Sequence, residues 1–163
     1  MKAPRILTLV FTAIIIVSCG CGRKVPGTDR AIVSVTAEDA AMNRAIAEAR
    51  ASVGEFIRKF QNPSPDETDF AVKMPISDEK QTEHFWLGNL TYSNGVFFGT
   101  INNDAETVKT VTLGQKCSVK EGDISDWLYM KGRKMIGNRT LTALFPHMPP
   151  EDVAAIKKQF EMD

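Results

Sequence analysis

Asp126 and Trp127 combine residue types that suit a small binding site. An Asp at a corner that opens a strand can accept backbone N–H bonds and hold the turn. Aromatic walls with few convergent polar groups are typical of small-ligand pockets. The sequence therefore predicts that any ligand pocket lies between Trp86, Asp126 and Trp127, with Lys73 or Arg139 as a counter-charge. The structural alternative is that Asp126 holds the turn while Trp127 fills the core.

The chain has two histidines, His84 and His147, and His84 shares a predicted strand face with Trp86. As a general base, His84 needs a nucleophile and an orienting carboxylate nearby. The structural alternative is a strand-end histidine at the rim of a sheet. No spacing typical of a metal site, no phosphate-binding Gly-rich loop and no G-x-S-x-G motif occurs. We therefore predict no metal, no cofactor and no catalytic residue.

A β-hairpin is the element that must position Trp86. Residues 70–76 alternate between apolar and other types, which predicts a half-buried strand. A second strand spans about 83–92, a third 96–102, and Asn94-Gly95 between them is a strong two-residue turn signal. Counting back from this turn pairs position 92 with 97, 90 with 99, and 88 with 101. That register places residues 86, 88, 90, 92, 97, 99 and 101 on one face.

Helices flank this sheet at both ends of the sequence. Thr36 with Asp39 resembles a capping box, and an apolar stripe then continues to Phe60 before Pro63. After the hairpin, short strands are predicted at 108–113, 116–119, 127–130 and 134–136, then helices at 140–145 and from 150. The predicted fold is α+β: an N-terminal helix packed on a strongly bent five- or six-stranded antiparallel sheet or small open barrel, with short C-terminal helices.

The N-terminal segment indicates export. Lys2 and Arg5 precede an apolar run at 6–17, which has the length of a secretory signal and is shorter than a membrane span. Residues 16–19, Ile-Val-Ser-Cys, resemble the lipobox of bacterial lipoprotein precursors. We therefore predict a signal peptide at 1–18, lipidation of Cys19, a tether at 19–36, and one domain at 37–163. The alternative is an ordinary secreted protein with a cysteine near its cleavage site.

The predicted location is the outer membrane, with the domain facing the periplasm. Gly20, and not Asp, follows Cys19, so the inner-membrane retention signal is missing. Removing residues 1–18 takes away two of the 20 basic residues and none of the 20 acidic ones, leaving a net charge of −2. This balance argues against nucleic acid as a partner. Cys117 is either a half-buried strand cysteine or the disulfide partner of Cys21.

Several motifs of the chain resemble one bacterial family. They are Glu83-His84-Phe85-Trp86, the run from Gly95 to Asn103, the run from Ile124 to Tyr129, and Gly137-Asn138-Arg139-Thr140. They resemble the YegJ-like family of bacterial domains of unknown function over about residues 40–145. The resemblance implies a shared fold and carries no activity with it.

Two functions remain open at this point. The first is a lipoprotein of the envelope, anchored to the membrane through Cys19, whose domain binds an envelope protein or a small ligand without catalysis. The alternative is a small envelope hydrolase or lyase that uses His84 or Asp126.

Overall fold

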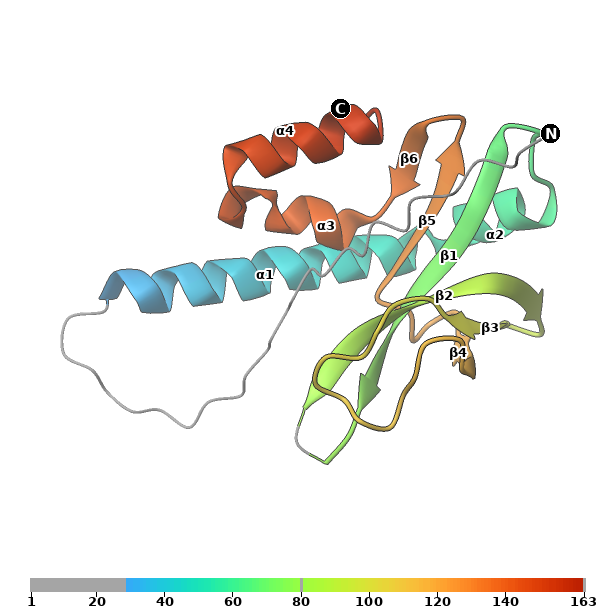
Figure 1. Cartoon of the computed structure of the whole chain (residues 1–163), viewed down its shortest axis with the longest axis horizontal. Helices are drawn as coiled ribbons and strands as arrows, with labels where there is room; N and C mark the ends of the chain where they lie inside the picture. The colour runs from blue at the N-terminus through green and yellow to red at the C-terminus, as the bar shows by residue number, and fades with distance from the viewer. Residues whose placement is uncertain (1–28, 80, 163) are drawn as a thin grey trace, which may run out of the picture.

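The computed structural model describes residues 29–79 and 81–162, and Figure 1 shows their arrangement. The elements are α1 (Asp29–Ala51), α2 (Val53–Gln61), β1 (Glu67–Ser77), β2 (Thr82–Ser93), β3 (Val96–Ile101), β4 (Lys116–Lys120), β5 (Asp126–Lys131), β6 (Lys134–Gly137), α3 (Arg139–Leu144), a 3₁₀ turn (Phe145–His147) and α4 (Pro150–Gln159). The strands form one antiparallel sheet in the order β4-β3-β2-β1-β5-β6. The predicted α+β class is confirmed, with a curved open sheet. The predicted signal peptide, Cys19 and Cys21 lie outside the described residues.

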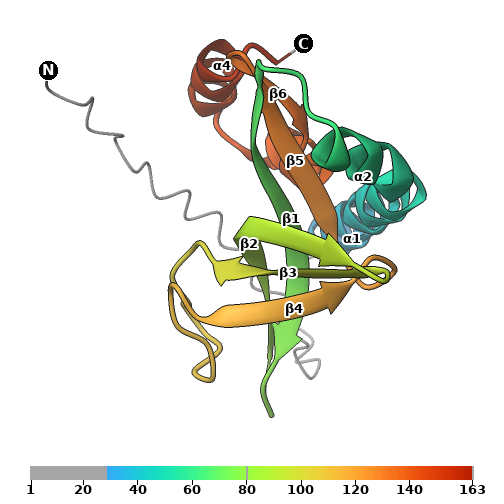
Figure 2. The same cartoon turned by 90° about the vertical axis from the view of Figure 1, so that its right-hand side faces the viewer.

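Strand β1 joins two halves of the sheet. Its register with β5 runs from Glu67 to Lys73, and its register with β2 runs from Val72 to Ser77. In these registers, Val72 and Lys73 are paired on both sides. The two halves therefore meet at this short overlap, and Figure 2 shows β2, β3 and β4 running across the direction of β1.

The hairpin forms at the predicted turn, but the predicted register holds only near it. Asn94 and Gly95 have φ values of 51° and 76°, and Tyr92 pairs with Phe97 as expected. Farther from the turn, Gly88 pairs with position 100 and not with 101, because a bulge intervenes. Asn89, with a φ of 50°, lies in this bulge. An extra residue reverses the inward-facing set.

This reversal explains which hairpin side chains are buried. Phe85 and Leu87 before the bulge are fully buried, together with Phe97 and Ile101 of β3. Trp86, predicted to share the face of Phe97 and Ile101, lies on the other face.

The N-terminal helix differs from the prediction at its start and near its end. It begins at Asp29, so the expected capping box at Thr36 is wrong and residues 29–36 of the predicted tether belong to α1. After Gly27 the sequence has no Gly or Pro until Gly54, so no helix-breaking residue prevents the helix from beginning before Thr36. The helix breaks at Ser52, whose hydroxyl donates to the carbonyls of Glu48 and Ala49. This bonding competes with the regular ladder and redirects the chain into α2.

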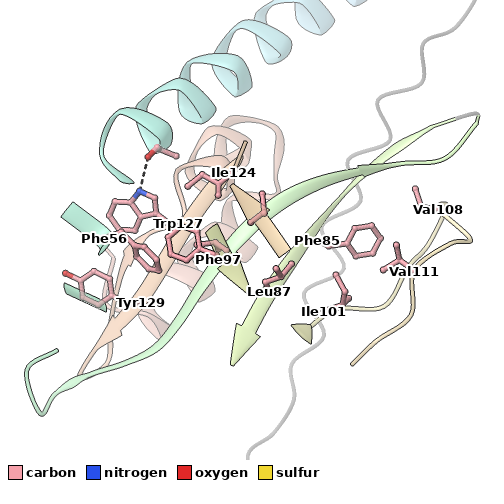
Figure 3. Packing of buried hydrophobic residues seen from close by; sticks show 13 residues of the cluster. Phe56, Phe85, Leu87, Phe97, Ile101, Val108, Val111, Ile124, Trp127 and Tyr129 are labelled. Atoms are coloured by element: carbon pink, nitrogen blue, oxygen red, sulfur yellow. Dashed lines mark hydrogen bonds between the residues drawn. The ribbon is translucent and has the colours of Figure 1, made fainter. Parts of the chain in front are cut away.

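Figure 3 shows the packing of the core. One part lies between the two helices and the sheet, and the segment after β3, with Val108 and Val111, covers the other part beside Phe85 and Ile101. Phe56 of α2 contacts the rings of Phe97 and Trp127, with centroids 5.8 and 5.4 Å away. The other fully buried apolar residues are Phe85, Leu87, Ile101, Val72, Val108 and Ile124, with Ala49 of α1. Among the described residues, no helix is long and apolar enough to cross a bilayer.

The predicted strand at 108–113 is wrong. The segment has no regular secondary structure, although Val108 and Val111 are buried in the core. The Glu83 carboxylate accepts the backbone N–H groups of Glu106, Thr107 and Val108. Since a carboxylate satisfies these donors, the segment buries its valines without joining the sheet.

Candidate functional site

Three of the predicted site residues form one cross-strand row at the junction of the two halves of the sheet. Lys73 of β1 pairs with Trp86 on one side and with Asp126 on the other. Residues of one such row point to the same face. Trp127 belongs to the next row, which pairs with Val72, and it therefore faces the core. The predicted residues are close in the fold, but they lie on two faces of the sheet.

The Asp126 carboxylate fastens α3 to the start of β5. Its Oδ2 atom accepts the backbone N–H and the hydroxyl of Thr140, each over 2.7 Å, and its Oδ1 accepts the N–H of Trp127 over 2.9 Å. Asp126 is 0% and Thr140 2% exposed. Hydrogen bonds to an ionised acceptor are the strong ones. Asp126 thus holds the turn, as the structural alternative expected, and it also positions a helix.

Lys73 completes this polar cluster. Its Nζ donates to the Thr140 hydroxyl over 3.1 Å and lies 5.0 Å from the centroid of the Trp86 ring. Burial lowers the pKa of the Lys73 ammonium, and the nearby Asp126 carboxylate partly opposes this effect. An amine with a lowered pKa is a better base or nucleophile than an exposed lysine. Here it is bound to Thr140 and stacked on Trp86.

His84 forms a hydrogen bond with a buried serine. Its Nδ1 lies 2.7 Å from the Ser125 hydroxyl, and Ser125 is 1% exposed. Burial, and then the positive charges of Lys73 and Arg50, lower the pKa of His84 to about 4. The imidazole is therefore neutral at pH 7 and can act as a base. Both oxygens of the neighbouring Asp126 carboxylate already accept hydrogen bonds from Trp127 and Thr140, as described above.

Trp127 and Arg139 pack together at the start of α3. The Trp127 Nε1 donates to the Ala49 carbonyl of α1 over 3.0 Å, which Figure 3 shows. The Arg139 guanidinium carbon lies 4.7 Å from the centroid of the Trp127 ring. The Arg139 Nη1 atom is buried and has no hydrogen-bond partner among the described residues. Arg139 therefore covers Trp127.

A cleft of about 440 Å³ lies between α2 and the β5–β6 strands, and we call it the α2 cleft. Aromatic and aliphatic groups form its wall: Phe56, Trp127, Tyr129 and Ile136. Polar groups of α2 and the residue after it form its rim: Glu55, Arg58, Lys59 and Asn62. Of the predicted site residues, Trp127 lines this cleft. The rim was missed from the sequence because alternating charges along a helix resemble an ordinary solvated face.

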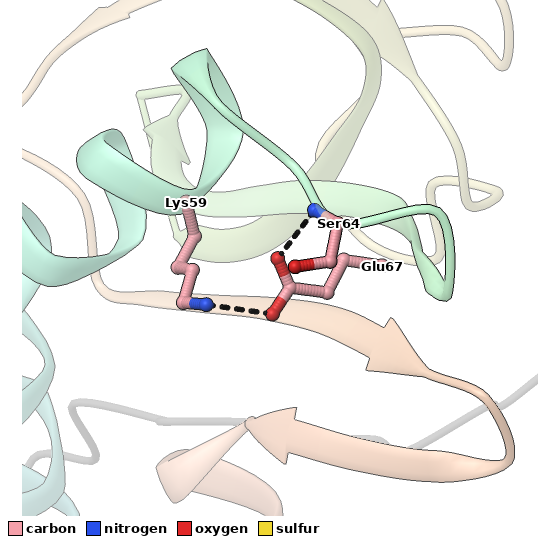
Figure 4. A network of polar contacts seen from close by, with 3 residues as sticks. All are labelled: Lys59, Ser64 and Glu67. Carbon is pink, nitrogen blue, oxygen red and sulfur yellow. Dashed lines mark hydrogen bonds and ion pairs between the residues drawn. The ribbon is translucent and has the colours of Figure 1, made fainter.

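An ion pair fixes the rim of the α2 cleft (Figure 4). Lys59 Nζ lies 2.8 Å from a Glu67 carboxylate oxygen, and the Ser64 N–H donates to the other oxygen over 3.0 Å. The Glu67 side chain is completely covered. The hydrogen bonds that Lys59 and Ser64 donate to Glu67 hold the pKa of this carboxyl below its usual value. The same bond to the Glu67 carboxylate raises the pKa of Lys59. This contact orders the connection from α2 to β1.

Among the described residues, no three His, Cys, Asp or Glu side chains converge as metal ligands. Cys117 is half-buried in β4. The chemistry that this part of the chain presents is therefore one base beside a covered hydroxyl, one buried amine, and an aromatic cleft with a mixed-charge rim.

Comparison with known proteins identifies relatives. A family model described as an uncharacterized protein conserved in bacteria (DUF2314) matches residues 39–163. The chain is 43% identical over 117 residues to the uncharacterized protein YegJ of Escherichia coli K12, covering 72% of this chain and 75% of that protein. It is 28% identical over 132 residues to a putative ankyrin repeat protein of Neisseria meningitidis serogroup B, covering 76% of this chain and 52% of that protein. No solved structure matches the chain significantly.

Proposed function

The chain belongs to this family of uncharacterized bacterial proteins (DUF2314), and we propose that its mature form is a lipid-anchored protein of the cell envelope that acts by binding and not by catalysis. The lipobox-like residues before Cys19 support the anchor. Gly20 after it supports the outer membrane, with the domain in the periplasm. Several acyl chains on one cysteine hold a protein firmly to a bilayer.

The proposal of binding without catalysis rests on the hydrogen bonds that the buried polar groups make with one another. Asp126, Thr140 and Lys73 satisfy one another, and the Ser125 hydroxyl is covered by its contact with His84. A nucleophile or general acid must reach a substrate atom. These groups instead fasten α3 and the start of β5 to the sheet.

We place the binding site for an envelope protein or a small ligand in the α2 cleft. Its volume lies within the usual range for ligand pockets, about 300–1,000 Å³. Its aromatic wall and its mixed-charge rim suit a ligand with an apolar body and polar substituents. The wall itself belongs to the core, so a substitution of Trp127 would test folding and not binding.

The test of the site therefore uses the rim. The purified protein is used to capture partners from detergent-solubilised envelopes, and its melting temperature is measured with candidate ligands. Arg58→Ala and Asn62→Ala should each lose the captured partner or the ligand-induced rise in melting temperature. Arg133→Ala, which removes an exposed ion pair with Glu161 outside the cleft, is the matched control. Capture that is equal in all of these variants would refute the site.

The test of the anchor is metabolic labelling with a tagged palmitate. The wild-type protein should carry the label, and Cys19→Ser should lose it. Cys21→Ser, only two residues away, is the control and should remain labelled. An unlabelled wild-type protein, or one with an uncut leader, would refute the anchor.

The hydrogen bond between His84 and Ser125 supports a second candidate, a small envelope hydrolase or lyase that uses His84 or Asp126. It places a neutral base 2.7 Å from a hydroxyl. In this case His84→Ala should leave the protein folded and abolish turnover in a broad substrate screen. A screen that finds no turnover in the wild-type protein would eliminate this candidate.

A further inference from the structure

A second hollow, of about 510 Å³, lies on the face of β2, β3 and β4 that points away from the core. The bulge at Asn89 bends β2 beside it. The backbone of Gly99 forms part of its floor. We call this hollow and its three strands the outer groove.

An exposed aromatic ring stands at the centre of the outer groove. Phe98 of β3 is 47% exposed, and it pairs with Thr91 of β2 on one side and Ser118 of β4 on the other. The next row pairs Thr100 with Lys116, and the Asn89 amide donates to the Thr100 hydroxyl over 3.0 Å. A large apolar side chain in such a polar frame does not serve the core. It offers a flat contact surface bordered by hydroxyl and amide groups.

The charge of this face is positive. Of the β2, β3 and β4 residues that share it by register, Lys116 and Lys120 of β4 are charged and the others are neutral. In the neighbouring strands, Lys73 and Asp126 continue the Trp86 row with one charge of each sign. On a strand these two positions are about 13 Å apart. Glu121, beyond the end of β4, accepts the hydroxyl of Tyr92. The face is therefore complementary to an extended ligand that carries negative charges along its length.

Sugar rings match these groups. The C–H face of a pyranose packs on an aromatic ring, and its hydroxyl groups exchange hydrogen bonds with Thr, Ser and Asn side chains. Antiparallel sheets in other folds bind oligosaccharides on a strand face in this way. Carboxylates on a glycan would pair with the two lysines through charge-assisted hydrogen bonds.

The position of the outer groove favours a glycan over a lipid surface as its ligand. Helix α1 is 23 residues long, about 35 Å, and it begins at the end of the molecule opposite to β3 and β4 (Figures 1 and 2). The proposed lipid on Cys19 precedes that end of α1 in the chain. A domain held in this way presents the outer groove away from its own membrane.

We propose that the outer groove binds the carboxylate-bearing glycan of the bacterial cell wall. This proposal rests on the proposed envelope location. It assigns a second surface, distinct from the α2 cleft, and gives it a polymer and not a small ligand. Phe98 supplies the stacking platform, and Lys116 and Lys120 supply the charge.

The test is co-sedimentation of the full-length protein in detergent with purified, protein-free cell-wall sacculi. Chitin particles, which have a related sugar backbone without carboxylates, are the neutral comparison. The wild-type protein should sediment with sacculi more strongly than with chitin, and less at high salt. Phe98→Ala should weaken the binding about fivefold to tenfold. The double variant Lys116→Gln/Lys120→Gln should weaken it similarly and remove most of the salt dependence.

Leu113→Ala is the matched control, because Leu113 is an even more exposed apolar residue, 57%, that does not line the hollow. It should bind sacculi like the wild-type protein. Equal binding by Phe98→Ala, equal binding to chitin, or no binding by the wild-type protein would overturn the proposal. All variants change exposed side chains, and an unchanged melting temperature verifies that they are folded.

A membrane is the competing occupant, and a second measurement addresses it. The variant Phe98→Trp is reconstituted in phosphatidylglycerol–phosphatidylethanolamine vesicles that contain brominated lipid. Its fluorescence should be quenched no more than that of the wild-type protein, which has Trp86 and Trp127. Strong additional quenching would place this face on lipid and overturn the glycan proposal. Palmitate labelling of Cys19 tests the anchor independently, so the failure of one proposal is distinguishable from the failure of the other.

Discussion

Replacing Asp126 with Ala should remove much of the stability of the domain. The substitution leaves the N–H and hydroxyl of Thr140 and the N–H of Trp127 without their acceptor, all at buried positions. It also removes the negative charge beside the Lys73 ammonium. Breaking a buried charged cluster by removing one partner destabilises proteins by about 3–5 kcal/mol. Domains of this size have a total stability of about 5–15 kcal/mol, so the variant should be close to unfolding at 37 °C.

The contribution of the buried amine can be separated with a double-mutant cycle. Lys73→Met keeps an unbranched side chain and removes the charge that Asp126 compensates. The loss of unfolding free energy in the double variant Asp126→Ala/Lys73→Met should therefore be smaller than the sum of the two single losses by at least about 1 kcal/mol. Positive coupling of this kind shows that Asp126 and Lys73 act as one cluster.

The assay is urea unfolding at pH 7 and 25 °C, followed by tryptophan fluorescence and by circular dichroism. Asp123→Ala is the matched control, because Asp123 is exposed in the turn before the same strand and should stay within about 0.5 kcal/mol of the wild type. A loss of less than about 1 kcal/mol in Asp126→Ala would refute the structural role. In that case the carboxylate would be available for chemistry, and the hydrolase alternative would gain support.

Three further predictions concern pH and backbone conformation. The pKa of His84 is about 4 in the folded protein and about 6.5 in the unfolded chain, so the unfolded chain binds the proton first as the pH falls. The free energy of unfolding should therefore fall by up to about 3 kcal/mol between pH 6.5 and 4. The variant His84→Asn should flatten this pH dependence. Burial alone would raise the pKa of Glu83, but the hydrogen bonds from the N–H groups of residues 106–108 outweigh burial and lower the pKa. The variant Glu83→Gln should lose about 1–2 kcal/mol of unfolding free energy above pH 4.5, and those amides should exchange hydrogen faster. Gly137→Ala should cost about 3 kcal/mol or more, because φ is +89° and the added Cβ would lie 2.2 Å from the Trp127 carbonyl oxygen.

Each of these predictions has its own check. Equal slopes of unfolding free energy against pH in the wild type and His84→Asn would contradict the assignment of that titration. Unchanged exchange rates at 106–108 in Glu83→Gln would show that another group holds the segment. Gly122→Ala, where nothing lies within 4 Å of the added Cβ, is the control for Gly137→Ala and should be nearly neutral.

The sequence predicted those elements whose signals are local. Asn94-Gly95 identified the hairpin because both residues adopt the positive φ that the turn requires. Proline at the first turn identified α4, and alternation identified β1. These signals depend on the preferences of a few adjacent residues, and no tertiary contact overrides them here.

The errors arose where the backbone departs from regular strand pairing. Val108 and Val111 are apolar like strand residues, yet Glu83 satisfies the backbone beside them. Asn89 adopts a positive φ inside β2, and the resulting bulge exchanges the faces of Trp86 and Leu87. The sequence pattern did not reveal either departure, because Glu83 is distant in the chain and both faces of β2 are apolar around the bulge.

The candidate site shows the same limit. Lys73, Trp86 and Asp126 were identified by residue type, but their common row depends on pairing β1 with β5, more than fifty residues later in the chain. Thr140, which connects Lys73 to Asp126, carried no chemical signal of its own and was not identified. Sequence reasoning could therefore name the charged and aromatic members, but not the hydroxyl that joins them.

The position of this cluster gives it a further structural consequence. The two halves of the sheet meet at Val72 and Lys73, so the pairing of β5 with β1 rests on a short overlap. A slip of β5 by one residue would turn the Asp126 carboxylate into the aromatic core and bring Trp127 to the start of α3. The bonds from Thr140 to Asp126 cannot form in that register, and a buried charge without partners is strongly unfavourable. The polar cluster therefore selects the register in which Trp127 completes the core and lines the α2 cleft, which links the stability of the fold to the shape of the proposed binding surface.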